Sequence, residues 1–232
     1  MSNRLSELKK ASGQMQLVYK PVFLRISDQS EKAALDELID NNVSFYHDEI
    51  YGQLQELVKM KSPAQRIKPE EYPELIKKHL AGRDINAYGV WVYYPWSRRL
   101  VHMLDEEEFK LVRTNRNQYK ITAKEQEILS TKKIGIIGLS VGQSIALTLA
   151  MERGFGELRL TDFDTLELSN LNRIRSSVHN LGVPKVVITA REIAEMDPFL
   201  KVSCFFNGLT EENMNDFFLT NGKLDLLVDE CD

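Results

Sequence analysis

Residues 133–162 read KIGIIGLSVGQSIALTLAMERGFGELRLTD and decide the fold. A short apolar strand over 134–137 precedes a glycine-containing turn, Gly138 to Gly142. The pattern then predicts an amphipathic helix, followed by a second strand over 157–161 that ends on Asp162. A strand, a loop, a helix and a strand in this order form the mononucleotide-binding unit of α/β folds.

Two features of this unit suit a nucleotide. The N-terminus of the predicted helix offers free backbone N–H groups and a positive dipole end to a phosphate. Asp162 closes the second strand, where an acid is placed to bond a ribose hydroxyl. A glycine turn between a strand and a helix also serves packing alone, so the turn by itself indicates only some nucleotide-binding fold.

Strands and helices continue to alternate after Lys185. The pattern predicts a helix that Asp197-Pro198 ends, a strand over 201–206, a helix over 210–219 and a strand over 224–228. This alternation predicts an α/β fold with a Rossmann-like, mostly parallel sheet and flanking helices. Ligands bind beyond the carboxyl ends of the strands in such sheets. The acids that fall there are Asp162, Asp164, Asp229 and Asp232.

The first hundred residues predict a smaller α+β region. Its predicted elements are an edge strand or extended arm over 15–26, helices over 28–41, 43–61 and 68–82, and a hairpin of strands over 88–94 and 100–104. Asp28 is the expected cap of the first helix, with Glu31 reaching back to the cap N–H. We therefore divide the chain into an N-terminal region, 1–104, and a nucleotide-binding domain, 105–232. The N-terminal region shows no catalytic constellation, and its His102 is interpreted as structural.

Composition excludes several classes of protein. The chain has 232 residues, 43% of them hydrophobic, which is enough for a real core. A net charge of −4 does not favour nucleic acid as a partner. Two cysteines without a CxxC motif support neither a disulfide framework nor a zinc site. We find no secretory signal and no apolar run of about 20 residues, so we expect a cytoplasmic protein without a membrane partner.

Residues beyond Asp162 favour a metal-bound triphosphate over a dinucleotide. Arg173 and Lys185 supply positive charge for phosphates, which a hydride-transfer site does not require. Arg113 and Arg116 are three residues apart on a predicted helix over 106–120, so both can project from one side. Magnesium usually takes only one or two carboxylates beside water and phosphate oxygens. The acids in place for that role are Asp229 and Asp232.

The run DFDTLELSNLNR, from Asp162 to Arg173, is followed by Gly-Val-Pro-Lys185. It resembles the adenylation domain of the ThiF/MoeB and ubiquitin-activating enzyme family, whose motif is an acid–x–acid pair, Ser-Asn-Leu-x-Arg and Gly-x-x-Lys. The resemblance covers about residues 109–232. It implies an ATP-dependent adenylyltransferase that uses Mg2+ and ATP to activate the C-terminal carboxylate of a ubiquitin-like or sulfur-carrier protein as an acyl-adenylate. It also implies a homodimer.

The resemblance implies roles for individual residues. Asp162 would bind the ribose, and Lys185 a phosphate. Asn170 and Arg173 would align the triphosphate, whereas Arg116 would reach ATP from the partner subunit. The implied cofactor-binding residues are Gly138, Ser140, Gly142, Asp162, Asp164, Asn170, Arg173 and Lys185. The implied catalytic residues are Arg116, Arg173 and Asp232, and Asp232 is also the implied magnesium ligand.

The sequence departs from the family pattern in two ways. The phosphate loop of the family is usually GxGxxG, whereas here it is GLSVG, one residue shorter, with Ser140 where a glycine is expected. The sequence also ends at Asp232, before the crossover loop that often bears a catalytic cysteine, so we expect a piece of a longer bacterial ThiF-like protein. Cys204 and Cys231 do not match that cysteine and are expected to pack as small apolar side chains.

Two other functions remain open from the residues. The glycine turn and Asp162 also suit the pyrophosphate and ribose of a nicotinamide or flavin dinucleotide, as in a Rossmann-type oxidoreductase. Ser140 instead favours a catalytically inactive scaffold built on a nucleotide-binding fold.

Overall fold

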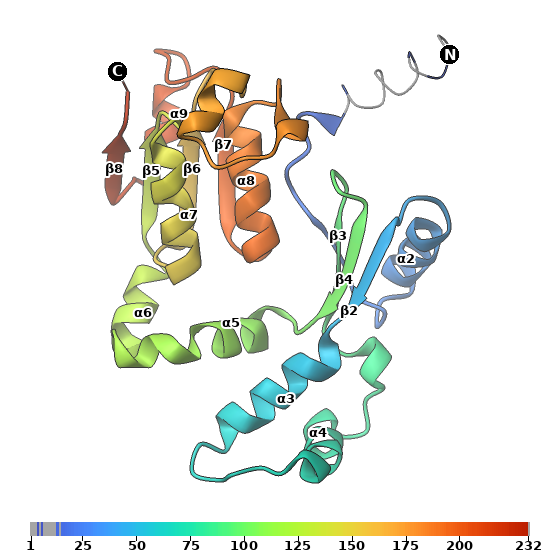
Figure 1. Cartoon of the computed structure of the whole chain (residues 1–232). Coiled ribbons are helices and arrows are strands. Elements are labelled where there is room, and N and C mark those ends of the chain that lie inside the picture. Colours follow the sequence, from blue (N-terminus) through green and yellow to red (C-terminus); the bar gives the residue numbers. More distant parts are fainter. Residues whose placement is uncertain (1–3, 5, 7–12, 14, 232) are drawn as a thin grey trace. The chain divides into compact units, whose positions relative to one another are not determined.

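The computed structural model describes residues 4, 6, 13 and 15–231, which form two compact units (Figure 1). One unit is continuous and runs from Pro21 to Lys120. The other joins the residues up to Lys20 with those from Ile121 onward. The predicted α/β class is confirmed: a Rossmann-like sheet flanked by helices lies in one unit, and a smaller α+β arrangement lies in the other.

The unit from Pro21 to Lys120 is built on a four-stranded sheet with the order β1-β3-β4-β2. Its strands are β1 (Val22–Leu24), β2 (Phe45–Asp48), β3 (Val90–Tyr94) and β4 (Arg99–Met103). The hairpin of β3 and β4 is present as predicted, and β1 extends it in antiparallel fashion at one edge. The helices of this unit are α2 (Gln29–Asn41), α3 (Ile50–Lys61), α4 (Tyr72–Leu80) and α5 (Glu106–Thr114), with 3-10 turns at Pro69–Glu71, Ile85–Ala87 and Asn115–Tyr119.

The prediction of a helix over 43–61 was wrong in its first part. Residues Phe45–Asp48 form β2, which pairs in parallel with β4 some fifty positions later in the chain. The helix begins only at Ile50, whose N–H donates to Asp48 Oδ1 at 3.3 Å. Pairing with a distant strand overrides the local helical pattern because it satisfies the backbone of these residues within a sheet.

The capping of α2 is confirmed only in part. Asp28 Oδ1 accepts from the N–H groups of Ser30 and Glu31 at 2.8 and 3.1 Å, as an N-cap residue does. The Glu31 carboxylate, however, accepts from the N–H of Arg25 and not from that of Asp28. The chain before the helix thus turns back onto Glu31.

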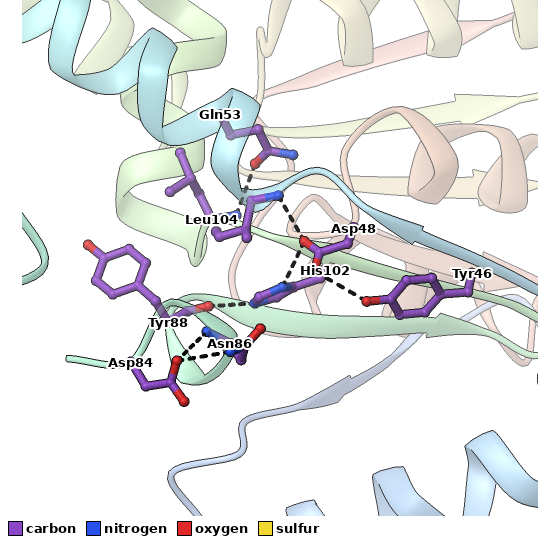
Figure 2. A network of polar contacts seen from close by, with 9 residues as sticks. Tyr46, Asp48, Gln53, Asp84, Asn86, Tyr88, His102 and Leu104 are labelled. Carbon is purple, nitrogen blue, oxygen red and sulfur yellow. Dashed lines mark hydrogen bonds and ion pairs between the residues drawn. The ribbon is translucent and has the colours of Figure 1, made fainter. Parts of the chain in front are cut away.

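His102 is a buried structural residue, as predicted (Figure 2). Its Nδ1 lies 3.0 Å from Asp48 Oδ1, and its Nε2 lies 2.7 Å from the carbonyl oxygen of Tyr88. The ring stacks on Trp91 with centroids 4.2 Å apart. Both ring nitrogens of His102 thus lie within hydrogen-bond distance of an oxygen atom. The network ties β4 to β2 and to the start of α3.

The second unit contains a fully parallel sheet with the order β7-β6-β5-β8. Its strands are β5 (Lys133–Ile137), β6 (Glu157–Thr161), β7 (Lys201–Phe205) and β8 (Leu226–Asp229). Its helices are α6 (Ala123–Leu129), α7 (Gly142–Glu152), α8 (Lys185–Met196) and α9 (Met214–Leu219), with 3-10 turns at Leu168–Asn172 and Val178–Asn180. Within the described residues, no helix combines the length and the apolar character needed to cross a membrane.

Helices cover both faces of β5. A Cβ atom added to Gly135 would lie 3.0 Å from the ring of Phe217 on α9, whereas one added to Gly142 on α7 would lie 2.7 Å from Ile136. Successive residues of a strand face opposite sides of a sheet. Helices α9 and α7 therefore pack on opposite faces, and each approaches the strand closely because a glycine leaves room for it.

The segment just before β1 belongs to the parallel-sheet unit. The guanidinium of Arg191 on α8 donates to the carbonyl oxygens of Val18 and Met15 at 2.8 and 2.6 Å. Tyr19 packs against the apolar core of the parallel-sheet unit, and the centroid of its ring lies 6.3 Å from that of Phe206. The predicted arm over 15–26 is thus divided between the two units, since only its last part forms β1.

Glu192 on α8 gives the parallel-sheet unit a pH-dependent stability. Burial, and to a smaller extent the charge of Glu195, raise the pKa of Glu192 from 4.5 to about 7, although Arg175 partly offsets both effects. Between these two values the folded protein binds a proton that the unfolded chain releases, so stability falls as the pH rises through this window. We expect Glu192→Gln to raise the denaturation midpoint at about pH 8 and to leave it unchanged at about pH 4.

The measurement is circular dichroism during urea denaturation at both pH values. Glu127→Gln on α6 is the control, because Glu127 is exposed and its loss should change neither midpoint. An equal gain for Glu192→Gln at both pH values would contradict the assignment, since the amide would then act by packing and not by removing a charge.

Candidate functional site

The site residues after β5 and β6 lie together at the carboxyl edge of the parallel sheet. Gly138 directly follows β5, and its N–H donates to the carbonyl oxygen of Thr161 at the end of β6 at 3.0 Å. The N–H of Glu230, after β8, donates to Ile137 at 2.9 Å. The connections from β5 leave toward β6 on one side, and β8 lies on the other. Such a switch point is where ligands bind in open α/β sheets.

The two glycines of the turn have different roles. Gly138 has a φ of +80°, and a Cβ atom there would lie 2.5 Å from the carbonyl oxygen of Glu230. No other residue type fits this position without shifting the chain that follows β8. Gly142 instead lets α7 pack directly on Ile136. Both glycines are explained by the turn and its packing, so their contact with a nucleotide stays a prediction.

Asp162 holds the glycine turn in place by accepting a hydrogen bond from its backbone. The residue is 8% exposed. Its Oδ2 accepts from the N–H of Leu139 at 2.7 Å, and its Oδ1 accepts from the N–H of Asp164 at 2.8 Å. The carboxylate thus links the glycine turn to the loop after β6. Each carboxylate oxygen has a second acceptor position, so the group can still receive a hydroxyl of a ligand.

Lys185 is brought to Asp162 by pairing of the chain around it. An isolated bridge joins Thr165 to Pro184, and the N–H of Lys185 donates to the carbonyl oxygen of Asp164 at 3.0 Å. Although Lys185 begins α8, this pairing fixes it beside the loop after β6. The twenty-residue gap between the acid pair and the lysine is therefore closed by backbone hydrogen bonds.

The ammonium group of Lys185 has three oxygens around it. Its Nζ lies 2.7 Å from Asp164 Oδ2, 3.3 Å from Ser140 Oγ and 3.9 Å from Asp162 Oδ2. The residue is only 5% exposed, whereas the side chain of Asp164 is 51% exposed. A buried ammonium is costly unless it is paired. Here its nearest anion is the half-exposed carboxylate of Asp164.

Asn170 lies in the 3-10 turn Leu168–Asn172, which follows β6, and Arg173 is the residue directly after that turn. Asn170 is buried, and its Oδ1 accepts from the N–H of Glu167 at 3.0 Å. Arg173 is exposed, and its Nη1 donates to the side chain of Asn172 at 3.1 Å. Within residues 15–231, no hydrogen bond or ion pair joins either residue to Lys185. The structure gives Asn170 a local role in the turn, and the phosphate role of both residues stays a prediction.

The remaining predicted residues lie elsewhere. Arg116 is exposed in the 3-10 turn Asn115–Tyr119 of the other unit. Asp232 falls outside the described residues. Asp229 ends β8 exposed, and its Oδ1 accepts from the N–H of Cys231 at 3.1 Å. In the part of the chain that the structure describes, no three His, Cys, Asp or Glu side chains come together as a metal site.

Thr161 was not predicted as a site residue. Its side chain is fully buried at the end of β6, next to Asp162, and its Oγ1 has no hydrogen-bond partner among the described residues. The available signal was a polar residue at the carboxyl end of β6, directly before Asp162. The residues present suit an anionic nucleotide: an ammonium and a hydroxyl for phosphates, and a carboxylate for a ribose, around a turn that only glycine can make.

Three comparisons extend this description. The model of the ThiF family matches residues 113–232. Uncharacterized protein MT1398 of Mycobacterium tuberculosis (strain CDC 1551 / Oshkosh) is 39% identical over 209 residues, which cover 90% of this chain and 27% of that protein. Ubiquitin-like modifier-activating enzyme 5 of Drosophila willistoni is 29% identical over 98 residues, which cover 42% of this chain and 24% of that enzyme.

Among solved structures, E. coli tRNA N6-threonylcarbamoyladenosine dehydratase, TcdA, matches 51% of this chain and 49% of its own, with 23% identity and a TM-score of 0.47. The chain spans about a quarter of the length of the two relatives above. The family model covers just over half of the chain, from the end of α5 onward, and includes every described residue of the candidate site. All of these residues except Arg116 lie in the parallel-sheet unit. The chain belongs to the ThiF family.

Proposed function

We propose that the chain is the nucleotide-binding part of an ATP-dependent adenylyltransferase that activates a carboxylate as an acyl-adenylate. One observation carries the proposal: the buried ammonium of Lys185 lies between the glycine turn and the acid pair, in a chain of the ThiF family. A buried cation at the carboxyl edge of a parallel sheet is suited to a phosphate group.

The described residues of the site would bind different parts of ATP. Lys185 would pair with a phosphate, and Ser140 would lie beside it on the glycine turn. Asp162 would accept a ribose hydroxyl with the acceptor positions that its two backbone bonds leave. ATP would supply the adenylyl group: a carboxylate oxygen attacks the α-phosphorus, the bond from that phosphorus to the bridging oxygen breaks, and pyrophosphate leaves. Charges placed around that phosphate stabilise the transition state more than the ground state.

Other roles are proposed from the family pattern. Asn170 and Arg173 would align the triphosphate. For this, the exposed side chain of Arg173 would change its conformation. Arg116 would approach from the partner subunit of a homodimer, and Asp232 would bind Mg2+ together with the phosphates. The Drosophila relative is named as activating a ubiquitin-like modifier. We therefore propose the C-terminus of a ubiquitin-like or sulfur-carrier protein as the substrate, in the cytoplasm.

The test is ATP binding by the whole chain, followed by exchange of labelled pyrophosphate into ATP with candidate carrier proteins. We expect a fluorescent ATP analogue to bind and unlabelled ATP to displace it, and exchange to depend on a carrier with a free C-terminal carboxylate. Tight NADH binding without ATP binding would instead assign the chain to the dinucleotide-binding oxidoreductases. Binding of neither nucleotide would leave a scaffold and would overturn the proposal.

A further inference from the structure

Ser140 occupies the turn at a position where the family pattern has a glycine, and its side chain is directed at Lys185. Its Oγ lies 3.3 Å from Lys185 Nζ, across 45 positions of sequence. Neighbouring hydroxyls behave differently: Ser144 Oγ, one turn into α7, donates to the backbone carbonyl of Val141 at 2.9 Å. The contact to Lys185 is therefore particular to Ser140.

The two close partners of Lys185 differ in charge. Asp164 is an anion with a half-exposed side chain, 2.7 Å from Nζ. A phosphate that approaches the ammonium is repelled by this carboxylate, because like charges at short range oppose each other. Asp164 must then swing into solvent or bind a cation. The neutral hydroxyl of Ser140 causes no such repulsion, so its bond to Lys185 can persist when a phosphate enters.

A hydroxyl both accepts and donates hydrogen bonds. When Ser140 Oγ accepts from the ammonium, its own hydrogen remains available as a donor. A glycine offers neither group, and alanine adds a methyl group without them. The hydroxyl thus gives the turn a second donor beside Lys185, at the place where the backbone N–H groups of the α7 N-terminus meet a phosphate.

We propose that Ser140 is a positioning residue that keeps the Lys185 ammonium at the glycine turn when a nucleotide phosphate takes the place of Asp164. This inference rests on the proposed function and adds a residue to the same site. It explains how the turn can depart from the usual glycine pattern and still bind a triphosphate. A glycine would let a phosphate come close to the backbone, whereas Ser140 holds the Lys185 ammonium beside the turn.

The experiment compares the ATP dissociation constants of Ser140→Ala and Ser140→Gly with that of the wild-type chain, each also in a Lys185→Met background. We expect both variants to bind ATP about five- to tenfold more weakly, which corresponds to the net contribution of one typical hydrogen bond. In the Lys185→Met background, neither Ser140 variant should weaken ATP binding further, because the effect of Ser140 acts through the ammonium group. Ser144→Ala is the matched control and should bind ATP like the wild type.

A second measurement needs no nucleotide. Acetic anhydride labels free lysine amines, and mass spectrometry gives the rate for Lys185 as a function of pH. We expect Ser140→Ala to shift the pH profile of Lys185 labelling and Ser144→Ala to leave it unchanged. A variant that only loosened the turn would change the rates of several lysines without moving this profile.

The outcomes separate the two claims. Ser140→Gly that binds ATP as well as or better than the wild type would overturn the positioning role while leaving the proposed function intact. A wild-type chain that binds no ATP would overturn the proposed function and the nucleotide part of this inference. The pH profile of Lys185 labelling then decides independently whether Ser140 positions Lys185. An unchanged profile in Ser140→Ala would contradict that role as well.

Discussion

Lys185→Met is expected to weaken ATP binding by about 10- to 100-fold, the range for losing a hydrogen bond to a charged group. Two effects act in the same direction. The phosphate loses its nearest buried cation, and the carboxylates of Asp162 and Asp164 lose the charge that balances them. Without the ammonium, both acids repel the incoming phosphates.

Lys132→Met is the matched control for this variant. Lys132 lies in the same unit and pairs with Asp225 at 2.8 Å, but both side chains are well exposed. Exposed ion pairs contribute little, so this control should bind ATP like the wild type. Isothermal titration with ATP measures both variants. A Lys185→Met protein that keeps wild-type affinity would show that the phosphates do not meet this lysine.

The loss of binding must be separated from a loss of folding. Both tryptophans of the chain, Trp91 and Trp96, lie in the unit from Pro21 to Lys120. Their fluorescence therefore follows that unit alone. Hydrogen exchange of β5 and β6 reports on the parallel sheet, and Lys185→Met should leave the protection of both strands near that of the wild type.

The parallel-sheet unit was largely predictable because its patterns are local. The apolar run of β5, the turn at Gly138 and the acid at Asp162 follow each other within thirty residues, and each element has its own periodicity. The alternation that continues to β8 then specified a parallel sheet. Long-range pairings were not predictable in this way. Strand β2 and the contact of Arg191 with the segment 15–20 depend on partners far away in sequence.

The candidate site shows the same division. The sequence pointed to Asp162 and Lys185, because their types and spacing match a motif. It did not show that Asp162 is bonded to the N–H of Leu139, or that Ser140 contacts Lys185. Those contacts depend on how the turn after β5 folds against the loop after β6. Spacing predicts which residues share an edge of the sheet, but not which atoms meet there.

Arg159→Met is expected to destabilise the parallel-sheet unit by about 3–5 kcal/mol, the usual cost of removing one partner of a buried ion pair. Arg159 is 1% exposed on β6, and its Nε lies 2.8 Å from Glu157 Oε1. Its other nitrogens donate to the carbonyl oxygens of Phe217, Thr220 and Gly222 at and beyond the end of α9. The carbonyl of Phe217 lies in the last turn of α9, where a helix leaves its carbonyls without an intrahelical partner.

The double variant Arg159→Met/Glu157→Leu tests the cause. Replacing both charges removes the orphaned carboxylate, so part of the stability should return, whereas the carbonyls after α9 stay unpaired. Urea denaturation followed by circular dichroism gives the midpoints, and hydrogen exchange should show lost protection over 157–161 and 214–222. If Arg159→Met alone kept the wild-type midpoint, the guanidinium would not be what joins α9 to β6. Because α9 packs on Gly135 of β5, the same loosening should reach the strand that carries the glycine turn.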